Sequence, residues 1–115
     1  MPGYTFKVTV KATDRIFSLK FSPEGNDDLS IIWNRQEGFS KFTSDPFSVE
    51  VTGQFDYKIV LGARTTTKYD YLIQIKSGGK WVDIKKDTRT VSNKNSDTVT
   101  ESIDIDPSIK PLPAI

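Results

Sequence analysis

Apolar and polar side chains alternate along most of this chain. Tyr4, Phe6, Val8 and Val10 alternate with threonine and lysine, which is the period of a strand with one buried and one solvated face. Further segments predicted as strands are Phe17–Phe21, Leu29–Trp33, Phe47–Val51, Tyr57–Gly62, Tyr69–Lys76, Trp81–Lys86 and Thr98–Asp106. No stretch of comparable length carries a helical apolar stripe as well as these segments carry the alternation.

Turn-forming residues separate the segments at short intervals. Gly78 and Gly79 stand between two alternating runs and supply the positive φ that a tight hairpin needs. We therefore predict an all-β fold, an antiparallel two-sheet β-sandwich of the immunoglobulin or fibronectin III-like kind, with a small barrel as the second choice. Residues 1–107 are assigned to the sandwich domain and 108–115 to a proline-rich C-terminal tail.

Composition excludes several classes of function. The 115 residues include neither cysteine nor histidine, which rules out disulfides, zinc sites with such ligands and the Ser-His-Asp triad. With 16 basic against 15 acidic residues the formal charge is +1, so nothing in the overall charge favours nucleic acid. No apolar run reaches the length of a signal peptide or membrane span. We expect no membrane insertion and a cytoplasmic or non-classically secreted protein.

Acidic pairs are the first candidates for chemistry. Asp27 and Asp28 lie in a predicted turn, and Asp104 and Asp106 share one face of the last predicted strand. Such pairs could share Ca²⁺ or work as an acid and a base, but turn formation and a solvated strand face explain them as well. We predict no catalytic residues, no metal and no cofactor.

Basic residues gather near the end of the chain, at Lys80, Lys85, Lys86, Arg89 and Lys94. Asp83, Asp87 and Asp97 interleave with them. The basic residues could contact phosphates, but the mixture is more typical of a solvated strand edge, where charges also discourage edge-to-edge aggregation.

Aromatic residues beside polar groups give the sharpest hypothesis. Trp33, Asn34 and Arg35 form one such group, and Trp81 with Asp83 forms another. We predict these five as the ligand-binding residues of a carbohydrate site, with a core position as the alternative for Trp33. Alternation places Val82 and Ile84 on one face and Trp81, Asp83 and Lys85 on the other, so Trp81 is expected to be exposed or at a half-buried rim position. Tyr69 and Tyr71 share an apolar face with Ile73 and Ile75.

Four stretches resemble the fungal immunomodulatory proteins of the Fve type, which are small, cysteine-free, lectin-like β-sandwiches. The stretches are "FSLKFSP" (Phe17–Pro23), "FSKFTSDPFSVEVTG" (Phe39–Gly53), "SGGKWVDI" (Ser77–Ile84) and "SDTVTESIDIDP" (Ser96–Pro107). The resemblance implies a non-enzymatic protein that binds carbohydrate or glycoprotein on immune cells and forms a homodimer.

The sequence departs from that family in two places. Its members dimerise through an N-terminal helix and a swapped strand, whereas "YTFKVTVKA" (Tyr4–Ala12) alternates as a strand does. The tryptophan of the family's early loop is missing from "SPEGNDD" (Ser22–Asp28). Two other classes stay open, namely a protein–protein or structural module without sugar affinity and, more remotely, an enzyme that uses paired carboxylates.

Overall fold

The computed structural model describes residues 3–26, 31–36, 38–92 and 94–111. Within this part of the chain every regular element is a strand. The strands are β1 (Gly3–Ala12), β2 (Ile16–Pro23), β3 (Trp33–Gln36), β4 (Lys41–Ser44), β5 (Phe47–Glu50), β6 (Gln54–Ala63), β7 (Lys68–Ser77), β8 (Lys80–Thr90) and β9 (Ser96–Asp104).

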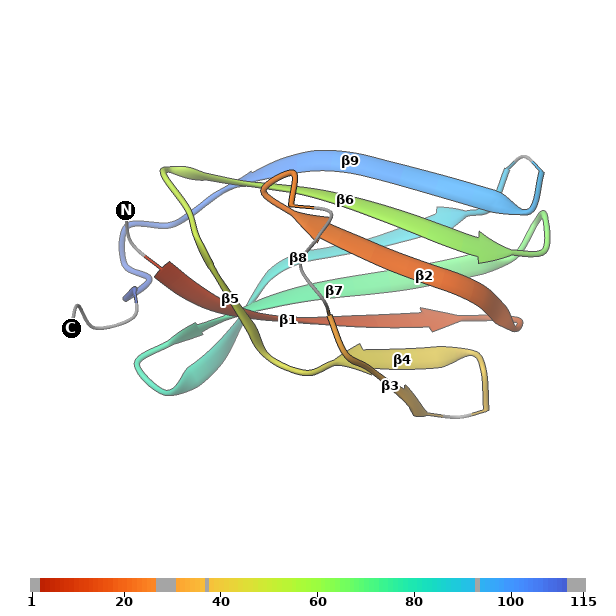
Figure 1. Cartoon of the computed structure of the whole chain (residues 1–115), viewed down its shortest axis with the longest axis horizontal. Coiled ribbons are helices and arrows are strands. Elements are labelled where there is room, and N and C mark those ends of the chain that lie inside the picture. Colours follow the sequence, from red (N-terminus) through yellow and green to blue (C-terminus); the bar gives the residue numbers. More distant parts are fainter. Residues whose placement is uncertain (1–2, 27–30, 37, 93, 112–115) are drawn as a thin grey trace.

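The strands form two sheets that pack face to face (Figure 1). The larger sheet has the order β3-β4-β1-β7-β8, and β5 pairs with the part of β1 that β4 leaves free. The smaller sheet has the order β2-β6-β9, and all pairings are antiparallel. The predicted fold class, an all-β antiparallel two-sheet sandwich, is therefore confirmed.

The N-terminal segment is a central strand, as its alternation predicts. β1 pairs along one edge with β7 and along the other with β4 and then β5. Pro46 interrupts the second edge because proline has no N–H for a ladder. The buried Ser44 Oγ accepts the Val8 N–H at 2.9 Å at that break, so the interruption leaves no unpaired donor there.

Aromatic rings join the two sheets. Phe6 of β1 stacks on Phe55 of β6 with ring centroids 4.1 Å apart, and both side chains are fully buried. Phe21, Phe47 and Tyr57 extend this cluster. Burying such rings supplies much of the apolar area that stabilises a sandwich of this size.

The strand predicted at Leu29–Trp33 is wrong in position. Leu29 and Ser30 lie outside the described residues, Ile31 and Ile32 belong to no strand, and β3 starts at Trp33 and runs through the polar residues to Gln36. Among the described strands, β3 lies at the sheet edge and pairs with β4 alone, with Trp33 opposite Ser44. An edge strand with one solvated face does not need an apolar run, and this explains the error.

Strands β7 and β8 form the predicted double-glycine hairpin. Gly78 and Gly79 both have positive φ, 58° and 85°, as a two-residue hairpin loop requires. Further along, Ile73 pairs with Lys85 while Gln74 pairs with Asp83, so Ile84 is an extra residue in β8. This β-bulge reverses the alternation. The prediction that Lys85 shares a face with Trp81 is therefore wrong, because Lys85 lies opposite the buried Ile73.

The segment after β9 packs against the sandwich as far as it is described. Ile109 is buried and belongs to the hydrophobic core. The Lys110 N–H donates to Ser77 Oγ at 3.1 Å, which holds the segment beside the β7–β8 hairpin. Residues 112–115 lie outside the described part.

Truncation of the inter-sheet stack tests this core. We expect Phe55→Ala to lower the free energy of unfolding by about 3–5 kcal/mol, because it removes a fully buried ring and leaves a cavity. The matched control is Phe17→Ala, since Phe17 is 54% exposed, and it is expected to change stability by less than about 0.5 kcal/mol. Urea unfolding measures both, and equal losses in the two variants would contradict this account of the core.

Candidate functional site

Trp81 lies on the outer face of the larger sheet. It pairs with Lys76 of β7 and is only partly buried, as the alternation predicts. The Lys7 Nζ of β1 stands 4.6 Å from the centroid of the indole, and the Lys76 Nζ stands 5.9 Å from it. Both distances are within the range of cation–π attraction. Two cations from different strands therefore meet at one accessible aromatic ring.

A polar pair borders this ring. Asp83 Oδ1 accepts a hydrogen bond of 2.8 Å from Gln74 Nε2, and the two residues pair across β7 and β8. Lys7 pairs with the same Gln74 on the other side. We call Lys7, Gln74, Lys76, Trp81 and Asp83 the tryptophan platform. It combines an apolar ring with hydrogen-bond donors and acceptors, the combination that fixes polar ring-shaped ligands.

The structure separates the five predicted binding residues. Trp81 and Asp83 share the platform, but β3 lies at the other edge of the sheet, four strand spacings or roughly 19 Å away. Trp33 points toward the other sheet and packs against the core, and Asn34 donates to Asp45 Oδ1 at 2.7 Å. Arg35 stands over the Phe39 ring at 4.4 Å. The two tryptophans therefore lie at opposite edges of the larger sheet.

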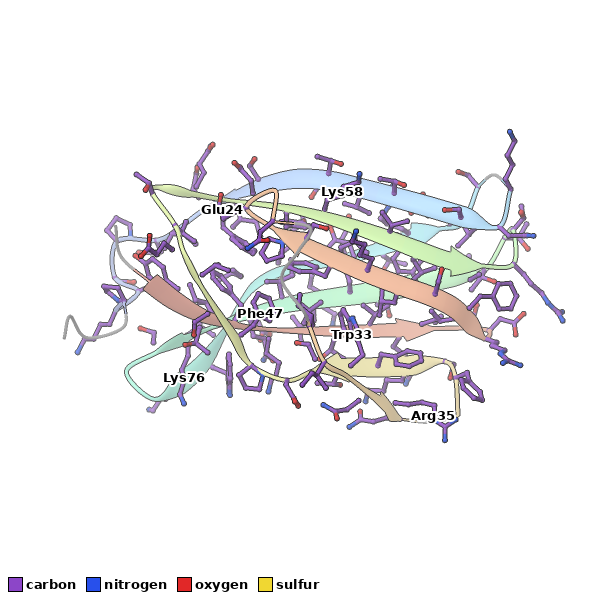
Figure 2. All side chains as sticks on the ribbon, viewed as in Figure 1. Glu24, Trp33, Arg35, Phe47, Lys58 and Lys76 are labelled. Atoms are coloured by element: carbon purple, nitrogen blue, oxygen red, sulfur yellow. The ribbon has the colours of Figure 1, made fainter. Side chains whose placement is uncertain are left out.

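Trp33 lines a small groove where the two sheets part. The groove measures about 180 Å³, and its lining is Ile16, Phe17, Ser18, Leu19, Trp33 and Phe42. We call it the open-edge groove, because it runs between edge strand β2 of one sheet and edge strand β3 of the other. Arg35, at the end of β3, lies at the lower right of Figure 2, on the far side of Trp33 from the β7–β8 hairpin that carries Lys76.

Sequence reasoning missed Lys7, Gln74 and Lys76. Alternation placed all three on solvated strand faces. Gln74 and Lys76 come beside Trp81 through the β7–β8 hairpin, whereas Lys7 comes there through the pairing of β1 with β7. The local pattern contains no sign of the β1–β7 pairing, since about half of the chain separates the two strands.

A polar trough lies on the outer face of the smaller sheet. It measures about 540 Å³, and its lining includes Ser22, Glu24, Asp56, Lys58, Thr100 and Ser102. Glu24 and Lys58 are labelled on this upper side of the sandwich in Figure 2.

Glu24 is the unusual member of the trough. Its φ is 54°, its Oε1 is buried, and that oxygen has no hydrogen-bond partner. Burial raises the pKa of Glu24, and the nearby Asp56 carboxylate adds to the rise, although a backbone N–H of Asp56 opposes it. A carboxylate oxygen buried without a donor lowers the stability of the charged form.

At the opposite edge, charged side chains tie β8 to β9. Lys85 Nζ lies 3.2 Å from Glu101 Oε2, and Arg89 Nε lies 2.8 Å from Asp97 Oδ2. We call these four residues the seam. Three tyrosine hydroxyls join it from inside the sandwich: Tyr69 donates to Asp97 at 2.6 Å and Tyr57 to Glu101 at 3.0 Å, while Tyr71 shares a hydrogen bond of 2.9 Å with Tyr57.

The seam shifts the pKa of its members in the expected directions. Burial alone would raise the pKa of both carboxylates. Hydrogen bonds from Arg89 and Tyr69 instead hold the pKa of Asp97 below its ordinary value. Hydrogen bonds from Tyr57 and Lys85 do the same for Glu101. Burial and the neighbouring carboxylates raise the pKa of Tyr57 and Tyr69. The two carboxylates are thus ionised and accept hydrogen bonds. Their role is to hold the two sheets together.

The acidic pairs have local partners. Asp104 accepts from Gln54 Nε2 at 3.0 Å, and Asp106 accepts the Ser108 N–H at 2.9 Å in the turn after β9. That hydrogen bond lowers the pKa of Asp106. Asp27 and Asp28 lie outside the described residues. Across the described ranges, no three acidic side chains come together as metal ligands do, and no helix could cross a membrane.

Comparisons of this chain with protein-family models, curated proteins and solved structures found no match. The resemblance to fungal immunomodulatory proteins stays a prediction.

Removing one seam carboxylate tests its contribution. We expect Asp97→Asn to lower the free energy of unfolding by about 2 kcal/mol at pH 7, because charge-assisted hydrogen bonds from Arg89 and Tyr69 are lost. Since the pKa of Asp97 is lowered by folding, its contribution is present above the ordinary value of 3.8 and disappears as the pH falls through the folded pKa.

Urea unfolding at pH 7 and pH 3 measures this difference. The gap between the wild type and Asp97→Asn should narrow at pH 3. Asp104→Asn is the matched control on the same strand, at an exposed position, and should change stability little at either pH. A gap of constant size would show that Asp97 does not act through its charge.

Glu24 should show the opposite pH dependence. Its pKa is raised by folding, so the wild type loses stability as the pH rises through the folded pKa. We expect Glu24→Gln to raise the melting temperature slightly at pH 7 and to leave it near the wild-type value at pH 4. Glu50→Gln, at an exposed position of β5, is the control. A lower melting temperature for Glu24→Gln at pH 7 would contradict the account of the unpaired oxygen.

Proposed function

We propose that this protein is a non-catalytic, lectin-like carbohydrate-binding domain whose site is the tryptophan platform. The observation that carries the proposal is the position of Trp81, a partly exposed indole on a solvated sheet face between Lys7 and Lys76. The apolar face of a pyranose stacks on such a ring, and its hydroxyls bond to neighbouring polar groups. Asp83 and Gln74 stand in register beside the indole and can serve that purpose.

The fungal immunomodulatory resemblance agrees with this proposal and extends it to glycans on cell surfaces. The site differs from the one predicted from sequence, because Trp33, Asn34 and Arg35 are too far from Trp81 to share a small ligand. Trp81 and Asp83 stay in the proposed site. Lys7, Gln74 and Lys76 take the places of the other three.

A protein–protein module is the second candidate, and the open-edge groove favours it. Phe17 and Phe39 are 54% and 43% exposed near this edge, and Arg15 and Arg35 both stand over the Phe39 ring. Exposed aromatic residues with arginine are common in protein interfaces. A dimer in solution that Phe17→Ser dissociates, together with no affinity for any saccharide, would favour this candidate over the first.

Replacement of Trp81 tests the carbohydrate site. We expect Trp81→Ala to weaken binding to any saccharide found on a glycan array at least tenfold, which corresponds to about 1.4 kcal/mol. Trp81→Tyr should keep part of the affinity because it keeps an aromatic face. Titration calorimetry with the best-bound saccharide measures both variants.

Phe17→Ala serves as the control for loss of an exposed aromatic residue elsewhere on the surface. It should bind as the wild type does, and all variants should keep the wild-type melting temperature within about 4 °C. Saccharide binding that survives Trp81→Ala would move the site away from the platform.

A further inference from the structure

Charge is distributed unevenly over the two outer faces of the sandwich. On the larger sheet, the strand registers and the alternation place lysines on the outer face together with fewer carboxylates. The lysines are Lys7, Lys11, Lys41, Lys68, Lys76 and Lys86. The carboxylates are Glu50, Asp70 and Asp83. We call this surface the lysine face. On the smaller sheet, Lys20 and Lys58 are balanced by Asp56 and Asp104.

Two of the three carboxylates within the lysine face accept hydrogen bonds from neutral side chains. Asp83 accepts from Gln74 at 2.8 Å, and Asp70 Oδ1 accepts from Thr88 Oγ1 at 2.6 Å. Lys7 and Lys76 are directed instead at the indole of Trp81. Because six lysines stand against three carboxylates among the described residues of this face, it keeps an excess of positive charge, even though the whole chain has a charge of only +1.

The lysine face is hollowed at some distance from Trp81. A shallow depression of about 180 Å³ lies further along the same side of the sheet, with Thr9, Lys11, Lys41, Asp70, Leu72 and Lys86 in its lining. Trp81 pairs with Lys76 of β7, and Lys11 pairs with Asp70, six residues earlier on the same strand. Six residues of strand span roughly 20 Å. One end of this track offers an aromatic ring with two ammonium groups, and the other end offers the ammonium groups of Lys41 and Lys86.

We propose that the ligand of the tryptophan platform is an acidic glycan, a linear saccharide with sulfate or carboxylate groups, that lies along the lysine face from Trp81 toward Lys11 and Lys41. This inference rests on the proposed carbohydrate function and names its ligand class. One sugar ring stacks on Trp81. Its anionic group pairs with Lys7 and Lys76, which stand beside the ring already, and the following sugars reach Lys86 and Lys41.

Lysine suits this task because its compact ammonium pairs with an anion from many directions and needs no fixed planar geometry. A cation–π contact at an exposed position is weak, so the lysines can turn from the indole to the anion at little cost. A neutral saccharide would use Trp81, Gln74 and Asp83 but would bring no anion to the lysines. The acidic glycan uses both kinds of group, and this combination distinguishes it from duplex DNA, whose bases are stacked on one another, and from a lipid surface, which is held by charge.

Titration calorimetry with four probes tests the proposal: a heparin tetrasaccharide, a hyaluronan hexasaccharide, the neutral chitotetraose, and a short double-stranded DNA. Heparin and hyaluronan separate sulfate from carboxylate recognition. We expect at least one of these two to bind at least tenfold more tightly than chitotetraose at 150 mM salt. Its affinity should fall as the salt concentration rises, because ion pairs are screened.

Two double variants each remove two positive charges, one pair from each outer face of the sandwich. Lys7→Gln/Lys76→Gln removes the cations beside Trp81, and Lys20→Gln/Lys58→Gln removes two lysines from the outer face of the smaller sheet. The first should weaken binding of the acidic probe at least tenfold, and the second less than twofold. Trp81→Ala should also weaken it at least tenfold.

The outcomes separate this inference from the proposed function. If chitotetraose binds through Trp81 as tightly as the acidic probes do, the carbohydrate function stands and the acidic ligand is overturned. If DNA binds as tightly as the acidic glycans with the same dependence on Lys7 and Lys76, but not on Trp81, the face is a general polyanion surface and the inference fails. If neither the neutral nor the acidic saccharides bind, both proposals are overturned.

Discussion

A single additional residue in β8 determines how the sandwich presents its charged groups. Ile84 interrupts the pairing with β7, so residues before it and residues after it alternate in opposite senses. Trp81 and Asp83 consequently face solvent, while Lys85 and Arg89 turn toward the smaller sheet. There they meet Glu101 and Asp97. Without the bulge, one of these two arrangements would be lost, because strict alternation would place Asp83 and Lys85 on the same face.

The two long edges of the sandwich are closed by different means. At the β8–β9 edge, ion pairs and tyrosine hydroxyls fill the space between the sheets, and buried polar groups there have partners from both sheets. A satisfied network of this kind is rigid and requires one particular register. At the β2–β3 edge the lining is apolar and a groove remains. The difference explains why Trp33, on the second edge, packs between the sheets instead of facing solvent.

Function, as proposed, depends on the face of the larger sheet and not on the interior. Flat sheet faces bind small ligands poorly unless a ring or a cluster of charges projects from them, and Trp81 with its lysines provides both. The strands that carry these side chains are paired on both edges or joined by a tight hairpin, so the platform is held by the most regular part of the fold. Lys7 belongs to the central strand β1. The cation beside the Trp81 ring is therefore held by the sheet and not by a loop.

The sequence by itself determined most strands, their buried faces, the hairpin at Gly78 and Gly79, and the outward position of Trp81. All of these follow from the period of two and from the φ values open to glycine, which are local properties. Tertiary structure decided the rest: the shift of the third strand to Trp33–Gln36, the bulge at Ile84, the seam, and the meeting of Lys7 with Trp81. Those features depend on which strands pair and in which register, and long-range packing sets both. Alternation says which face a side chain occupies, but it contains no information about the neighbour it will find there.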